Sequence, residues 1–163
     1  MQTGTPWDFR SSQELRMSDI YTEEGYLIED ADYQYLECLK EEIESAFLEF
    51  TTLQKKKYVT LENAHQVIAN EESNDLRLYI MQKISIGTSF QRNYYNSAKS
   101  IIHHLCGNEL AMQKRPGLSI NLPGNPSDIL PIHADTWNGV SPFELNIWIP
   151  FVDCCDSMCL YIL

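Results

Sequence analysis

The tripeptide His133-Ala134-Asp135 places an imidazole and a carboxylate two residues apart. Residues at this spacing in a strand point to the same face, so both side chains can reach one metal ion. A histidine and a carboxylate are two of the three protein ligands in the facial triad of non-heme iron(II) oxygenases, whose remaining positions are open. The competing interpretation of so short a motif is a surface aspartate bonded to a neighbouring histidine at a strand end.

Other metal-ligating residues give weaker patterns. Three more histidines precede the motif, none follows it, and we do not expect them to supply a third ligand: His65, His103 and His104. Five cysteines are present, and three of them cluster: Cys154, Cys155 and Cys159. This cluster lacks the paired C-x-x-C elements or added histidines of a zinc site. The odd number and irregular spacing argue against a disulfide framework and predict a reduced, cytoplasmic setting.

The first part of the chain has helical periodicity. We expect one domain with a loose segment over 1–20 and a mainly helical part over 21–110. A short apolar run, 26–28, predicts an edge strand. The main helix is indicated by apolar residues at three- and four-residue steps: Tyr35, Leu39, Ile43, Ala46, Phe47 and Phe50. Further helices are predicted over 60–69, 74–84 and 90–105, the last of them capped by Gly107 and Asn108.

From Leu118 onward the period changes to two. Alternating or apolar runs separated by proline, glycine and asparagine predict four strands, over 118–122, 129–135, 143–149 and 158–163. Four closely spaced strands after a helical start predict an α+β fold in which helices flank a sheet or barrel. The motif then lies late in the second strand, with His133 and Asp135 aimed into the barrel.

The segment Arg115–Leu163 resembles the phytanoyl-CoA dioxygenase-like oxygenases, which depend on iron(II) and 2-oxoglutarate. More narrowly, it is similar to the StrG-like oxygenases of sporadic carbohydrate-biosynthesis clusters. The runs that carry the resemblance are Arg115-Pro-Gly-Leu-Ser-Ile-Asn-Leu-Pro123, the stretch from His133 to Pro150, and Ser157-Met158. The resemblance implies a double-stranded β-helix of the jelly-roll or cupin type, begun by residues 115–163 and incomplete at the C-terminus.

The resemblance also implies the roles of individual residues. His133 and Asp135 match the first two iron ligands, and Trp148 matches a tryptophan that lines the 2-oxoglutarate pocket. To these we add Asn121 and Asn146 as residues that can bond a carboxylate, with a cross-strand hydrogen bond as the alternative. The implied activity is oxidation of C–H bonds in a carbohydrate-related or other small metabolite.

The chain departs from the family in its second half. The family supplies a distal histidine ligand and a basic residue, usually arginine, that pairs with 2-oxoglutarate. Here no lysine or arginine follows Arg115. We expect the chain to be part of a longer product. The alternatives are an inactive relative that acts as a binding module, a barrel completed by a second chain through the apolar run 158–163, and a cupin-like metal hydrolase or isomerase.

Composition limits the partners. The 163 residues carry a formal net charge of -11, which disfavours binding to phosphate backbones. No run approaches the roughly 20 apolar residues of a membrane span. The predicted partners are therefore small molecules, with neither nucleic acid nor membrane involved.

Overall fold

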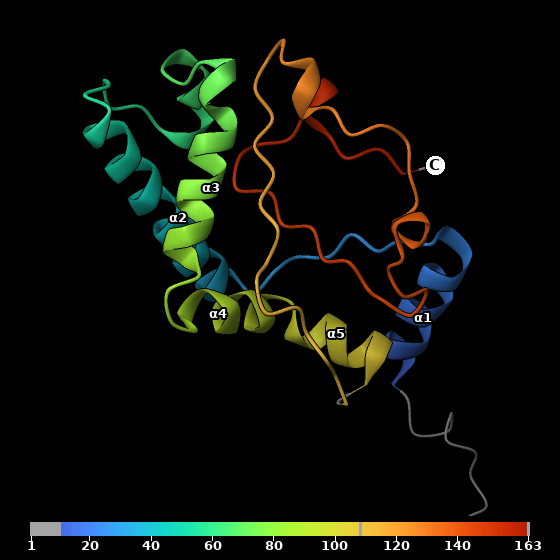
Figure 1. The fold of residues 1–163 in the computed structure, drawn as a ribbon. Coiled ribbons are helices and arrows are strands. Elements are labelled where there is room, and N and C mark those ends of the chain that lie inside the picture. Colours follow the sequence, from blue (N-terminus) through green and yellow to red (C-terminus); the bar gives the residue numbers. More distant parts are fainter. Residues whose placement is uncertain (1–10, 108, 163) are drawn as a thin grey trace, which may run out of the picture.

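The computed structural model describes residues 11–107 and 109–162, and its regular structure is helical (Figure 1). Five α-helices and five short 3-10 helices follow one another in this order: α1 Ser12–Glu24, α2 Tyr33–Leu53, η2 Leu61–Gln66, η3 Asn70–Glu72, α3 Ser73–Ile84, α4 Ser89–Ser97, α5 Lys99–Cys106, η4 Pro126–Asp128, η5 Asp135–Asn138 and η6 Asp156–Met158.

Helix α2 is the centre of the fold. The carboxylate of Asp32 caps it by accepting the backbone N–H of Gln34 at 3.1 Å. The apolar stripe predicted from the sequence faces inward, and five of its six residues are buried: Leu39, Ile43, Ala46, Phe47 and Phe50. Among the described helices, none combines the length and the apolar character needed to cross a bilayer.

Helices α3 and α4 pack against α2 and complete one hydrophobic core. Leu76 and Ile80 of α3 are at most 2% exposed, and Phe90 of α4 is 3% exposed. The rings of Phe50 and Tyr79 meet edge to face, with centroids 5.4 Å apart. The predictions of helices over 35–50 and 74–84 are therefore confirmed.

The single helix predicted over 90–105 is wrong, because the structure has two helices there. The chain leaves helical geometry at Ala98, whose φ is -122°. The carbonyl of Ser97 accepts the N–H of Asp32 at 2.8 Å, a bond from the start of α2. This contact between distant segments coincides with the break. The expected glycine cap of the second helix is present at Gly107, with φ of 80°.

The N-terminal segment also differs from expectation. Residues 12–20, expected to be loose, form most of helix α1. Ser11 and Glu14 form a reciprocal capping box at its start, and Gly25 ends it with φ of 78°. Helix α1 packs on α5 through the buried Met17. The run 26–28 that follows is not a strand.

The prediction of a partial double-stranded β-helix is wrong. No residue from 109 to 162 is in a strand, and the backbone hydrogen bonds among these residues only close local turns. All but one of the seven prolines lie between 116 and 150. Proline has no N–H to donate to a sheet ladder, and prolines lie within or next to the predicted strands 118–122, 129–135 and 143–149. The region runs instead as a wide irregular loop beside the helices (Figure 1).

Two extended segments in this region keep the predicted alternation of side chains. Over 116–122 and over 145–151, alternate residues are exposed, and the residues between them face the helices. The inward side chains that pack on the hydrophobic core are Leu118, Ile120, Leu122, Ile149 and Phe151. The hydroxyl of Tyr94 in α4 donates to the carbonyl of Ile147 at 2.6 Å. Period-two alternation is therefore kept within these two segments although no ladder forms, but Phe143, on the apolar side of the predicted strand 143–149, is 94% exposed.

Candidate functional site

The candidate site is the short stretch around His133 and Asp135, where a bend leads into η5. Asp135 is the first residue of η5, which ends at Gly139 with φ of 84°. The imidazole Nε2 of His133 lies 3.5 Å from Oδ1 of Asp135. The two side chains thus converge as the sequence predicted. The cause is different, because they follow a bend and a 3-10 turn and not a strand.

The hydrogen bonding of His133 fixes which ring nitrogen is free. Its Nδ1 lies 2.7 Å from the carbonyl oxygen of Pro131. A carbonyl oxygen only accepts, so Nδ1 carries the proton and donates. In the neutral ring, Nε2 then presents a lone pair to the Asp135 carboxylate. Two electron-rich atoms that face each other at 3.5 Å repel each other. A cation between them, or a proton on Nε2, would turn this repulsion into attraction.

This donor set fits a divalent metal ion. Histidine ligands commonly donate their other ring N–H to a backbone carbonyl, which fixes the tautomer, and Pro131 plays that part here. Because Nε2 of His133 and Oδ1 of Asp135 are 3.5 Å apart, both atoms could contact one such ion. Imidazole and carboxylate together suit iron, zinc and manganese. The residues present therefore offer two side chains of the kind that ligate a metal ion.

Asn146 joins this pair from the second extended segment. Its side-chain amide donates to Oδ2 of Asp135, the carboxylate oxygen that does not face His133. The sequence predicts Asn146 as a residue that can bond the carboxylate of 2-oxoglutarate. In the structure it bonds the carboxylate of Asp135, and this contact leaves Oδ1 toward the imidazole. The contact also joins the turn at 135 to the segment 145–151, eleven residues later.

The site is open to solvent. The side chains of His133 and Asp135 are 37% and 45% exposed, so the expectation that they point into a barrel interior is wrong. Trp148 is 51% exposed, and neither it nor Asn121 makes a hydrogen bond to the described residues. Within the described residues, neither side chain makes a hydrogen bond to His133 or Asp135.

The remaining histidines and cysteines do not complete the site. His103 bonds the hydroxyl of Tyr95 at 2.6 Å, and Nε2 of His104 lies 3.7 Å from Glu14. All five cysteines are free thiols. Burial raises the pKa of the Cys154 thiol, with the neighbouring cysteines adding to the effect. Within the described residues, no group of three histidine, cysteine or carboxylate side chains is arranged to hold a metal ion.

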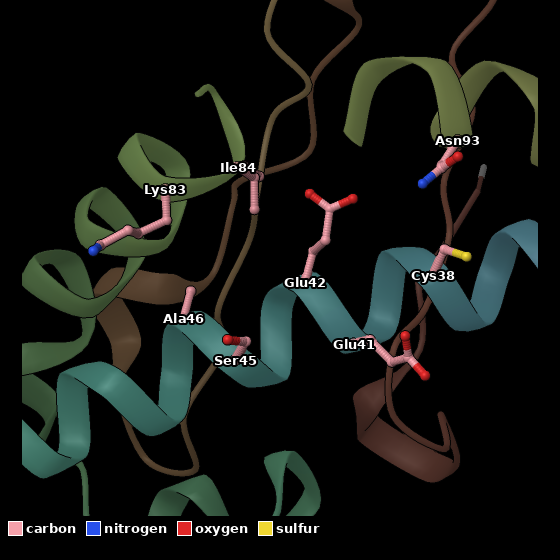
Figure 2. Close-up of a pocket in the computed structure, with 8 residues that line it drawn as sticks. All are labelled: Cys38, Glu41, Glu42, Ser45, Ala46, Lys83, Ile84 and Asn93. Atoms are coloured by element: carbon pink, nitrogen blue, oxygen red, sulfur yellow. The ribbon is translucent and has the colours of Figure 1, made fainter. Parts of the chain in front are cut away.

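Two hollows on the helical layer were not foreseen from the sequence. An open pocket of about 430 Å³ lies between α2, α3 and α4 (Figure 2). The carboxylates of Glu41 and Glu42 on its floor point in opposite directions, and the ammonium of Lys83 points away from both (Figure 2). The charges of this pocket do not converge on a ligand. A second hollow of about 630 Å³ is lined by residues that include Tyr35, His103 and His104. Nothing in the sequence pattern of these residues distinguishes them from ordinary residues on a helix surface.

Comparison with known proteins gives no further identification. No protein-family model, no curated protein and no solved structure matches the chain. The function of this chain is therefore inferred from the site itself and from the sequence pattern around it.

Proposed function

We propose that this chain provides the metal-binding segment of an iron(II)- and 2-oxoglutarate-dependent oxygenase. His133 and Asp135 are two of its three protein ligands. The observation that carries the proposal is the position of the His133 ring, which donates from Nδ1 to Pro131 and faces Asp135 with Nε2. The pattern of residues 115–163, similar to that family, supplies the reaction class.

The residues of this chain have simple tasks in such a reaction. The carbonyl of Pro131 holds the tautomer of His133, and Asn146 holds the carboxylate of Asp135. When bound there, iron(II) supplies the oxidation of a substrate C–H bond, coupled to the conversion of 2-oxoglutarate and dioxygen to succinate and carbon dioxide. The side chains themselves bind and orient, and none of them has to transfer a proton.

The substrate class and the compartment extend the same proposal. A carbohydrate-related or other small metabolite follows from the sequence resemblance. The net charge of -11 is unfavourable for nucleic-acid substrates. Five free thiols are suited to a reducing compartment such as the cytoplasm. None of the residues named in this proposal is the third metal ligand or the cation that pairs with 2-oxoglutarate.

Metal binding tests the proposal directly. Titration of the apoprotein with iron(II) under anaerobic conditions should give one site, and Asp135→Ala or His133→Ala should each weaken it by about tenfold or more. Asp153→Ala and His65→Ala are matched controls and should bind as the parent does. Helical circular dichroism should be the same in all four variants, because both ligands lie outside the α-helices.

The outcomes separate the alternatives. Unchanged iron affinity in Asp135→Ala would show that this residue is not a ligand. Absence of any site in the parent chain would favour a binding module without iron. Metal-dependent turnover that needs no dioxygen would point to a hydrolase or isomerase. Succinate release from 2-oxoglutarate with iron(II) would support the oxygenase.

A further inference from the structure

The segment Glu144–Trp148 has an open backbone edge. In extended chain, successive residues direct their N–H and C=O groups to opposite sides. The carbonyl of Ile147 is bonded to Tyr94, so the edge that contains it faces the helical layer. On the other edge, the N–H of Glu144 is bonded back to the carbonyl of Ser141, whereas Asn146 and Trp148 make no backbone hydrogen bond with any described residue. Such an edge is a template on which another extended chain can pair.

The two faces of this segment have different chemistry. Leu145 and Ile147 are half-buried, whereas Glu144, Asn146 and Trp148 are exposed. A strand added at the open edge would continue both faces. It therefore needs apolar side chains on the half-buried face, and residues that suit a carboxylate and an indole on the outer face.

The acidic charge of this region indicates that the outer residues of the added strand are basic. From 116 to 163 the chain has five acidic residues and no lysine or arginine: Asp128, Asp135, Glu144, Asp153 and Asp156. A lysine or arginine placed on the outer face would meet the carboxylate of Glu144 and the ring of Trp148, to which a cation is attracted. A second copy of this chain would bring the same acidic segment and a further net charge of -11. Self-association is accordingly disfavoured.

We propose that Glu144–Trp148 is a docking edge for an extended polypeptide in which apolar and basic residues alternate. The partner adds one strand through the backbone groups of Asn146 and Trp148. Its apolar side chains lie beside Leu145 and Ile147, and its basic side chains lie beside Glu144. This inference does not depend on a metal at His133 and Asp135, because it uses the backbone of the segment and its outer face.

The test uses the whole chain and a blocked heptapeptide that alternates lysine and valine. Fluorescence anisotropy of the labelled peptide should show saturable binding. A glutamate–valine peptide of the same length should bind about tenfold more weakly or not at all. A lysine–valine peptide methylated at the backbone nitrogens of one edge should lose binding, because it cannot donate to the segment. On binding, amide exchange should slow at Asn146 and Trp148 more than at Leu145 and Ile147.

Two pairs of variants locate the contact. Glu144→Lys should weaken peptide binding about fivefold, whereas Glu71→Lys, an equal charge change on η3, should have no more than a small effect. Trp148→Ala should also weaken it, in contrast to Trp137→Ala, which removes a 74% exposed indole outside the segment.

Several results would overturn the inference. Equal binding of the lysine and glutamate peptides would exclude charge recognition. Equal losses in Glu144→Lys and Glu71→Lys would show nonspecific attraction to an acidic protein. Unchanged exchange at Asn146 and Trp148 would exclude backbone pairing. A concentration-dependent dimer in sedimentation that protects these same amides would identify a second copy as the occupant.

Discussion

Removing one hydroxyl tests how the irregular C-terminal region is attached to the helices. Tyr94 of α4 donates to the carbonyl of Ile147 at 2.6 Å. Among the described residues, this hydrogen bond attaches the segment 145–151 to the helical layer. Tyr94→Phe keeps the ring and removes the donor. A neutral hydrogen bond contributes about 1 kcal/mol net, and the abandoned carbonyl of Ile147 adds to the loss. We expect the free energy of unfolding to fall by about 1–1.5 kcal/mol.

The assay combines urea unfolding with limited proteolysis mapped along the chain. Because the bond is local to one attachment point, cleavage within 145–151 should accelerate by about fivefold, which corresponds to about 1 kcal/mol. Cleavage within α2 should change less. Tyr58→Phe removes a hydroxyl from a side chain that is 66% exposed and is the matched control, with no expected effect. Parent-like stability together with parent-like cleavage in Tyr94→Phe would refute the attachment.

The pH dependence gives a second signature of the same residue. Burial raises the pKa of the Tyr94 phenol. The folded state therefore prefers the neutral hydroxyl more strongly than the unfolded state does. The stability from Tyr94 is present below the unfolded pKa of about 10 and is lost as the pH rises through the folded value. This alkaline loss should be smaller in Tyr94→Phe than in the parent.

Two further predictions concern the helical layer. The carboxylate of Glu72 accepts from Lys56 at 2.7 Å and from the backbone of Ala69 at 2.8 Å, and the Lys56 ammonium lowers the pKa of Glu72. Glu72→Gln should cost about 1 kcal/mol at neutral pH in thermal unfolding. The difference should shrink as the pH falls from the unfolded pKa of about 4.3 through the lowered pKa of the folded state, and a difference that does not change as the pH falls would contradict the ion pair. Leu76→Ala should cost about 2–5 kcal/mol in urea unfolding, since Leu76 is 1% exposed, and Leu78→Ala, 43% exposed, should cost under about 1 kcal/mol. Similar losses in both variants would contradict the assigned core.

The helical half of the chain was largely predictable. The stripe that includes Leu39, Ile43 and Phe47 repeats at helical steps, and a helix buries such a stripe wherever it finds a partner. The break at Ala98 was not predictable, because the bond from Asp32 to the Ser97 carbonyl joins residues 65 positions apart. No local sequence pattern around Ala98 predicts that contact.

The candidate site was predictable only in part. The spacing of His133 and Asp135 was interpreted as two side chains on one face of a strand; the structure has no strand there and brings them to 3.5 Å through a bend and the start of η5. The role of Pro131 as acceptor for the imidazole, and of Asn146 as donor to the carboxylate, depends on a fold-back over residues 131–146. Spacing alone does not specify such a fold-back.

The sequence by itself determined that side chains alternate between two faces in the extended segments 116–122 and 145–151. Alternation is a local property of extended backbone, and Ile120, Leu122 and Ile149 face inward as their pattern requires. Whether extended segments become strands was decided only by the tertiary structure. A strand exists through hydrogen bonds to a neighbour, and the described segments 116–122 and 145–151 pack on helices without pairing with each other. The physical reason is that burial of a side chain needs only a surface, whereas a ladder needs a second backbone in register.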